Sequence, residues 1–180
     1  MKFPSFKYHP DPIATGSVEP SDVVCEACGR AGGFIYKGPV YAEEELVDVI
    51  CPWCIADGTA HEKFGAEFVD AAGVGGYGEW QRVSPEIADE VAYRTPGFNG
   101  WQQERWFTHC NDAGEFLGPA GMKELERFGA EAMSAIRKES GLGVEEWDFY
   151  LKALDKQSGP TAYIFKCRHC GALGGYSDCH

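Results

Sequence analysis

The chain has 180 residues, of which 28 are acidic and 16 basic, giving a formal net charge of −12. This length fits one domain with a sizeable core, or one core with a small metal-binding module attached. No stretch approaches the roughly 20 apolar residues of a membrane span, and the first residues lack an apolar signal segment, so we expect a cytoplasmic protein. The acidic balance disfavours nucleic-acid binding, which relies on basic residues to neutralise phosphates.

Residues 1–20 are predicted to form an extended arm, because Pro10 and Pro12 hold the backbone out of a helix. The arm is expected to pack onto the body through three side chains: Phe6, Tyr8 and Ile13. We interpret His9 as a packed or surface residue that hydrogen-bonds through its ring nitrogens, rather than as a ligand or a base.

Two C-x-x-C pairs follow, and they carry the strongest chemical signal in the chain. They supply Cys25, Cys28, Cys51 and Cys54. Each pair forms a tight turn that brings two sulfurs together, and two such turns complete the tetrahedral set of thiolates that Zn²⁺ accepts in a structural site. A redox dithiol would not need the second pair, and disulfides are rare in a reducing cytosol. The sequence therefore predicts one structural zinc site.

Residues 21–58 are predicted to form a zinc-ribbon-like module around this site. Apolar residues at 34–36 and 39–41 flank a turn, which predicts a hairpin, and the apolar run 46–50 leads directly into the second cysteine pair. The module is acidic, since no Lys or Arg occurs between Gly38 and Glu62.

The rest of the chain, residues 59–180, is predicted to form a mixed helix and strand body, so the fold class is α+β with the ribbon-like module packed on the body. The predicted helices are 59–68, 85–94, a short one after Asn111 and Asp112, 122–139 and 144–156. The predicted strands are 103–109 and 161–165, with a glycine-rich loop at 73–78. Trp101 and Trp106 are expected to anchor the core.

A second cysteine constellation lies in this body. The C-x-x-C of Cys167 and Cys170 repeats the form of the first pair and needs further ligands. The candidates are His109, Cys110, Cys179 and His180. Adjacent residues on a strand point to opposite faces, which counts against His109 and Cys110 both binding unless Cys110 lies at a strand-to-helix junction, as Asn111 and Asp112 suggest. The open alternatives are a second zinc site and reduced cysteines that pack as small apolar side chains.

Several distinctive segments are spread over nearly the whole chain. They are YHPDP at 8–12, ATG at 14–16, CPWCIADG at 51–58, RTPGF at 94–98, GWQQE at 100–104, FLG at 116–118 and YIF at 163–165. With these segments the chain resembles the CbrC family, bacterial proteins associated with tolerance to colicins. The resemblance implies that His109 and Cys110, rather than Cys179, join Cys167 and Cys170 in any second metal site. It also implies a cytosolic protein that reduces the effect of a protein toxin, and it does not imply any enzymatic reaction.

These observations lead to three functional hypotheses. In the first, the protein gives tolerance or immunity to a bacterial toxin, with a basic nuclease as the expected partner, because an acidic surface associates quickly with a basic one. In the second, a zinc-ribbon regulator or adaptor binds nucleic acid or another protein. In the third, a zinc hydrolase keeps one coordination position open for water, but no H-x-x-x-H or nucleophile motif supports it. The sequence favours the first hypothesis, and we expect no enzymatic activity.

Overall fold

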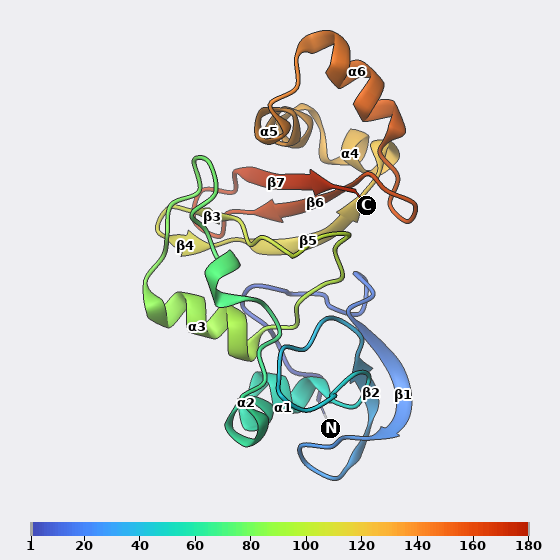
Figure 1. The fold of residues 1–180 in the computed structure, drawn as a ribbon, viewed down its shortest axis with the longest axis vertical. Helices are drawn as coiled ribbons and strands as arrows, with labels where there is room; N and C mark the ends of the chain where they lie inside the picture. The colour runs from blue at the N-terminus through green and yellow to red at the C-terminus, as the bar shows by residue number, and fades with distance from the viewer. Residues whose placement is uncertain (1, 180) are drawn as a thin grey trace.

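The structure, a computed structural model, describes residues 2–179. Figure 1 shows an N-terminal module at one end, a three-stranded sheet in the middle and a group of helices at the other end. The predicted mixture of helices and strands is confirmed, whereas a zinc ribbon in the strict sense is not. None of the helices in this described part of the chain combines the length and the apolar character that crossing a bilayer requires.

The N-terminal module consists of two strands and two short helices. They are β1 (Val18–Val24), β2 (Ala31–Tyr36), α1 (Pro52–Ala56) and α2 (Thr59–Phe64). The two strands form an antiparallel hairpin whose turn carries the first cysteine pair. Helix α1 begins directly after Cys51, with Pro52 in its first turn, where a backbone N–H has no helical partner to lose.

The strand partners in this module differ from the prediction. The hairpin predicted at 34–41 is wrong, because β2 pairs with β1 and the chain leaves the sheet after Tyr36. Residues 46–50 do not form a strand, although the Ile50 carbonyl accepts a hydrogen bond from the Tyr36 amide at 2.9 Å. The helix predicted at 59–68 is too long, because Gly65 ends it in a left-handed conformation with φ of 62°.

The body is built on a three-stranded antiparallel sheet in the order β5-β6-β7. Its strands are β5 (Glu115–Ala120), β6 (Thr161–Lys166) and β7 (Leu173–Asp178), preceded by a small hairpin of β3 (Thr108–His109) and β4 (Asp112–Ala113). The central strand β6, which confirms the strand predicted at 161–165, is buried on both faces. Tyr163 and Phe165 pack into the core below the sheet, and Ala162 and Ile164 pack against the helices.

Two predictions for this part of the body are wrong, and one strand was not predicted. The strand predicted at 103–109 shrinks to β3, and the short helix predicted after Asp112 is instead β4 followed by β5. Burial in β5 alternates residue by residue, which is the period of a strand, and Phe116 points into the core. Strand β7 has no prediction, because Gly174 and Gly175 interrupt any apolar alternation in its sequence.

The remaining helices lie on either side of the sheet. They are the 3₁₀ turn η1 (Ala71–Gly73) and the helices α3 (Pro85–Arg94), α4 (Met122–Phe128), α5 (Ala130–Ser140) and α6 (Val144–Ala153). Helix α3 confirms the helix predicted at 85–94, and α6 lies within the one predicted at 144–156. The single helix predicted at 122–139 is two helices, α4 and α5, separated by Gly129.

The N-terminal arm packs between the module and the sheet. Phe6 and Tyr8 are buried, as predicted, but Ile13 is 41% exposed, so its predicted packing is wrong. Trp106 is fully buried in the core, as predicted, whereas Trp101 is only half-buried and donates a hydrogen bond from Nε1 to the Thr161 hydroxyl at 2.9 Å. The division of the chain into arm, module and body stays a prediction.

Candidate metal centres

The first cluster joins the turn between β1 and β2 to the start of α1. Its ligand atoms, the Sγ atoms of Cys25, Cys28, Cys51 and Cys54, all lie within 4.8 Å of one another. The Cys25 and Cys54 sulfurs are 3.8 Å apart, and those of Cys28 and Cys51 are 4.0 Å apart. A tetrahedral zinc with Zn–S bonds of about 2.3 Å places its sulfurs about 3.8 Å apart, whereas a disulfide needs about 2.05 Å. The cluster therefore fits a metal ion and not disulfides.

Backbone geometry holds the first cysteine pair in place. The Gly29 amide donates a hydrogen bond to the Cys25 carbonyl at 2.7 Å, and the Cys25 amide donates one to the Arg30 carbonyl at 3.0 Å. Gly29 adopts φ of 67°, a left-handed conformation that glycine reaches at little cost. The Cys51 amide also donates a hydrogen bond to the Cys25 sulfur at 3.3 Å, which stabilises a thiolate there.

Ionisation of one thiol in this cluster opposes the ionisation of its neighbours. A hydrogen bond from the Cys51 thiol lowers the pKa of the Cys25 thiol to about 4, despite its burial. Burial, with the negative charge of Cys25 adding to it, raises the pKa of the Cys54 thiol to about 12. One thiolate thus suppresses the ionisation of its neighbours, and a divalent cation would remove that penalty.

The second cluster joins the β3–β4 hairpin to the turn after β6. Its ligand atoms come from His109, Cys110, Cys167 and Cys170 and also lie within 4.8 Å of one another. The Cys110 and Cys170 sulfurs are 3.8 Å apart, and the His109 Nδ1 atom lies 3.3 Å and 3.4 Å from them. Zinc bonds of about 2.3 Å to sulfur and 2.0–2.1 Å to nitrogen give an N···S separation of about 3.5 Å, so this set also fits a tetrahedral ion.

A tight turn allows both His109 and Cys110 to face the same centre. Cys110 and Asn111 have φ of 53° and 57°, and they form the two-residue turn between the paired residues His109 and Asp112. Positive φ at both central residues is the signature of a type I′ hairpin turn. Side chains of adjacent residues point to opposite faces only within a strand. Cys110 lies in the turn, so its side chain and that of His109 can face the same centre.

The C-terminal cysteine pair repeats the geometry of the first pair. The Gly171 amide donates to the Cys167 carbonyl at 3.0 Å, and the Cys167 amide donates to the Ala172 carbonyl at 2.8 Å, as Gly29, Cys25 and Arg30 do in the first cluster. The clusters differ in exposure, because Cys25, Cys51 and Cys54 are buried whereas His109, Cys110 and Cys170 are exposed. Cys179 is exposed and joins neither cluster, and His180 lies outside the described residues.

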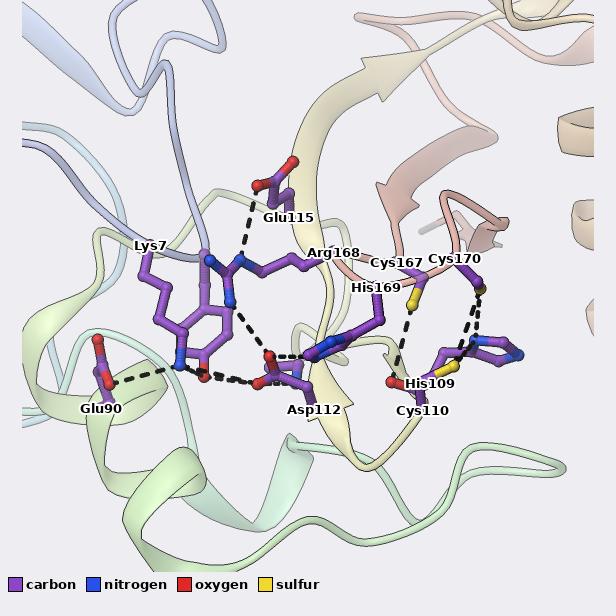
Figure 2. Close-up of polar contacts among 12 residues, drawn as sticks. Lys7, Glu90, His109, Cys110, Asp112, Glu115, Cys167, Arg168, His169 and Cys170 are labelled. Atoms are coloured by element: carbon purple, nitrogen blue, oxygen red, sulfur yellow. Dashed lines mark hydrogen bonds and ion pairs between the residues drawn. The ribbon is translucent and has the colours of Figure 1, made fainter.

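Beside the second cluster, a buried carboxylate binds side chains from two distant parts of the chain (Figure 2). Asp112 accepts hydrogen bonds from the Tyr8 hydroxyl at 2.7 Å, His169 Nε2 at 2.9 Å and the Arg168 guanidinium at 3.2 Å. Burial raises the pKa of the Asp112 carboxyl, but the hydrogen bonds from Tyr8 and His169 and the charge of Lys7 outweigh it and lower the pKa overall. Asp112 therefore ties the arm to the turn that carries Cys167 and Cys170.

Sequence reasoning missed this network and assigned Asp112 to a helix cap. A usable signal was present, since Asp112 closely follows the His-Cys pair, and Arg168 and His169 lie between Cys167 and Cys170. Metal-binding turns are commonly supported by such hydrogen-bonded groups outside the ligand set.

Comparison with known proteins places the chain in a family. A model described as "Uncharacterised protein family (UPF0167)" matches residues 3–179. The chain belongs to the UPF0167 family. UPF0167 proteins of Mycobacterium bovis and Mycobacterium tuberculosis are each 43% identical to it, over 99% of this chain and 94% of their own length. A UPF0167 protein of Pseudomonas aeruginosa is 40% identical, over 93% of this chain and 92% of its own length. No solved structure matches the chain.

The family assignment corrects the one suggested by the sequence segments. The resemblance to the CbrC family was wrong, because the matching family model and the curated relatives carry the UPF0167 name. The hypothesis that the protein gives tolerance to a toxin was based on that resemblance. The UPF0167 family is uncharacterised and does not support it. The two cysteine clusters, which could each hold a metal ion, remain as the chemical evidence for function.

Proposed function

We propose that this UPF0167 protein is a cytoplasmic two-zinc protein that works by binding another protein and not by catalysis. The observation that carries the proposal is that each cluster brings together four nitrogen or sulfur donors at tetrahedral spacing. Such sets suit Zn²⁺, and catalytic zinc sites instead combine three protein ligands with a water molecule. Closed ligand sets therefore favour a structural role for both ions.

The surface that we propose for binding is the acidic segment between β2 and α1. Glu43, Glu44 and Glu45 are all exposed, and none of them forms an ion pair within residues 2–179. Asp48, by contrast, is paired with Lys37. An exposed, uncompensated acidic segment on a chain of net charge −12 favours a basic partner, and a basic nuclease is the partner class that we expect.

The test compares charge reversals at two places. Glu43, Glu44 and Glu45 are changed to Lys in one variant, and the exposed residues Glu126, Glu145 and Asp148 are changed to Lys in a control with the same net charge. Both variants are measured by surface plasmon resonance against a panel of basic nucleases. We expect the first variant alone to lose at least tenfold in association rate, and the wild-type rate to fall with salt as the Debye length drops from about 10 Å at 0.1 M to about 3 Å at 1 M.

Two results would contradict this proposal. Equal losses in both variants would mean that only the total charge matters and that the acidic segment is not an interface. Tight binding of the wild type to DNA or RNA, without binding to any basic protein, would favour a regulator instead.

A further inference from the structure

The second cluster borders a pocket with a volume of about 730 Å³. Its walls come from the loop 77–81, the end of β3, strand β7 and helix α5. This volume lies within the range of about 300–1,000 Å³ that is usual for small-molecule sites. His109 and Cys110 belong to both the pocket lining and the metal cluster.

The apolar part of the pocket is aromatic. The Trp80 and Phe107 rings meet edge to face with centroids 5.5 Å apart, and the Phe107 and His109 rings are nearly parallel at 10°. Strand β7 contributes Gly174, where a Cβ atom would collide with the Phe107 ring. The absence of a side chain at Gly174 leaves room for the Phe107 ring, and aromatic ring faces favour contact with a planar ring.

The polar part of the pocket is a hydrogen-bond donor on His109. Its Nδ1 atom faces the sulfurs of Cys110 and Cys170, and Nε2 makes no hydrogen bond to any residue from 2 to 179. A histidine that binds a metal through Nδ1 carries its hydrogen on Nε2 and normally donates it to an oxygen acceptor. Because His109 is exposed and lines the pocket, a bound molecule can supply that acceptor.

The charges around the pocket disfavour an ionic ligand. The Lys138 ammonium pairs with Glu79 at 2.6 Å, and the Arg105 guanidinium pairs with Glu139 at 2.5 Å, so these charges cancel. Three thiolates and one Zn²⁺ leave the cluster with a net charge of about −1, which repels a carboxylate. An organic ammonium offers no acceptor to the His109 N–H.

We propose that this pocket binds a neutral, planar aromatic molecule that carries a carbonyl-type hydrogen-bond acceptor, with the ring against Trp80 and Phe107 and the acceptor at His109 Nε2. The donor role of His109 rests on the zinc proposed above, whereas the site itself is separate from the acidic segment. Binding of this ligand class is a function beyond partner recognition.

The test uses three probes that share one ring system and differ in charge: 2-naphthamide, 2-naphthoate and 2-naphthylmethylamine. Each is titrated into the zinc-loaded full-length protein by isothermal calorimetry, and contact with the protein is checked by saturation-transfer NMR. We expect the amide to bind at least tenfold more tightly than either charged probe.

Three variants locate the site and isolate the hydrogen bond. Trp80→Ala should weaken 2-naphthamide binding at least tenfold, because the variant removes the aromatic ring that the naphthalene ring contacts. Phe149→Ala, which removes a ring that is 79% exposed on α6, is the matched control and should leave binding unchanged. His109→Cys keeps four zinc ligands but removes the N–H, so the affinity for 2-naphthamide should fall about fivefold.

Zinc content is measured in every sample, so that the two proposals fail separately. Protein without zinc at the second cluster would contradict the proposed function. Zinc-loaded protein that binds the three probes equally, or whose amide binding survives Trp80→Ala, would overturn the ligand proposal.

Discussion

His9 shows how a single buried residue links the arm to the body. Its Nδ1 lies 2.7 Å from the Pro96 carbonyl, which can only accept, so Nδ1 carries the hydrogen and donates it. Its Nε2 lies 2.7 Å from the Thr15 hydroxyl and accepts from it. The ring is fully buried and edge-on to Phe116 at 5.1 Å. The interpretation of His9 as a packed, hydrogen-bonded residue is therefore confirmed.

The environment of His9 makes stability depend on pH. Burial lowers the pKa of the His9 imidazole to about 4, from about 6.5 in the unfolded chain. Between these values the unfolded state binds more protons than the folded state, so the free energy of unfolding rises with pH and falls as pH drops below about 6.5. From pH 7.0 to pH 5.5 this one group should remove about 1 kcal/mol of stability.

The variant His9→Gln isolates this contribution. Urea unfolding of wild type and His9→Gln at pH 7.0 and 5.5 gives the difference in their pH dependence, and metal loss from the cysteine clusters affects both proteins alike. We expect the variant to be less stable at pH 7.0, because it loses a buried hydrogen bond, and to lose about 1 kcal/mol less than wild type on acidification. An identical pH slope in the two proteins would show that His9 does not titrate in this way.

At the scale of elements, the junction between α4 and α5 depends on one glycine. Gly129 has φ of 88° and ψ of −174°, a region that residues with a side chain rarely enter. It ends α4, where its amide donates to the Leu125 carbonyl at 3.0 Å, and it begins α5. This break lets Leu125 and Ile136 face the same core beneath the helices.

Replacing Gly129 by Ala should therefore destabilise the fold by strain alone, since a Cβ atom there would meet no other atom within 4 Å. We expect a loss of about 1–3 kcal/mol in the free energy of unfolding. Gly143→Ala is the control, because Gly143 also precedes a helix but has φ of −64° and ψ of 172°, which any residue adopts. Similar effects of the two substitutions in thermal unfolding would argue against the strain at Gly129.

Local signals predicted some elements and failed for others. Pro85 at the start and the Arg94-Thr95-Pro96 stop define α3, because they act within one turn of the helix. The partner of β2 could not be predicted, because apolar residues lie on both sides of it in the sequence and only tertiary packing selects β1. The spacing of the cysteine pairs was enough to predict the first metal site. The left-handed turn at Cys110 could not be predicted, because Asn111 is its only local sequence signal.

At the scale of the whole molecule, the two clusters lie in different parts of the fold and stabilise different connections. The first cluster closes the N-terminal module, and the second closes the end of the sheet next to the β3–β4 hairpin. The first cluster uses two C-x-x-C pairs, and the second uses one C-x-x-C pair with the His-Cys turn. Together they include every cysteine except Cys179. Two zinc ions would therefore contribute to folding independently.

Zinc stoichiometry by native mass spectrometry tests this account most directly, because it counts bound ions in the folded chain. We expect two Zn²⁺ per wild-type chain, one in Cys170→Ser, one in Cys28→Ser and two in the control Cys179→Ser. Loss of the first ion should also destabilise the fold more than loss of the second, since the first cluster is the buried one. Reduced, folded wild-type protein that holds no zinc, or a Cys179→Ser variant that loses an ion, would contradict the assignment of two four-ligand zinc centres.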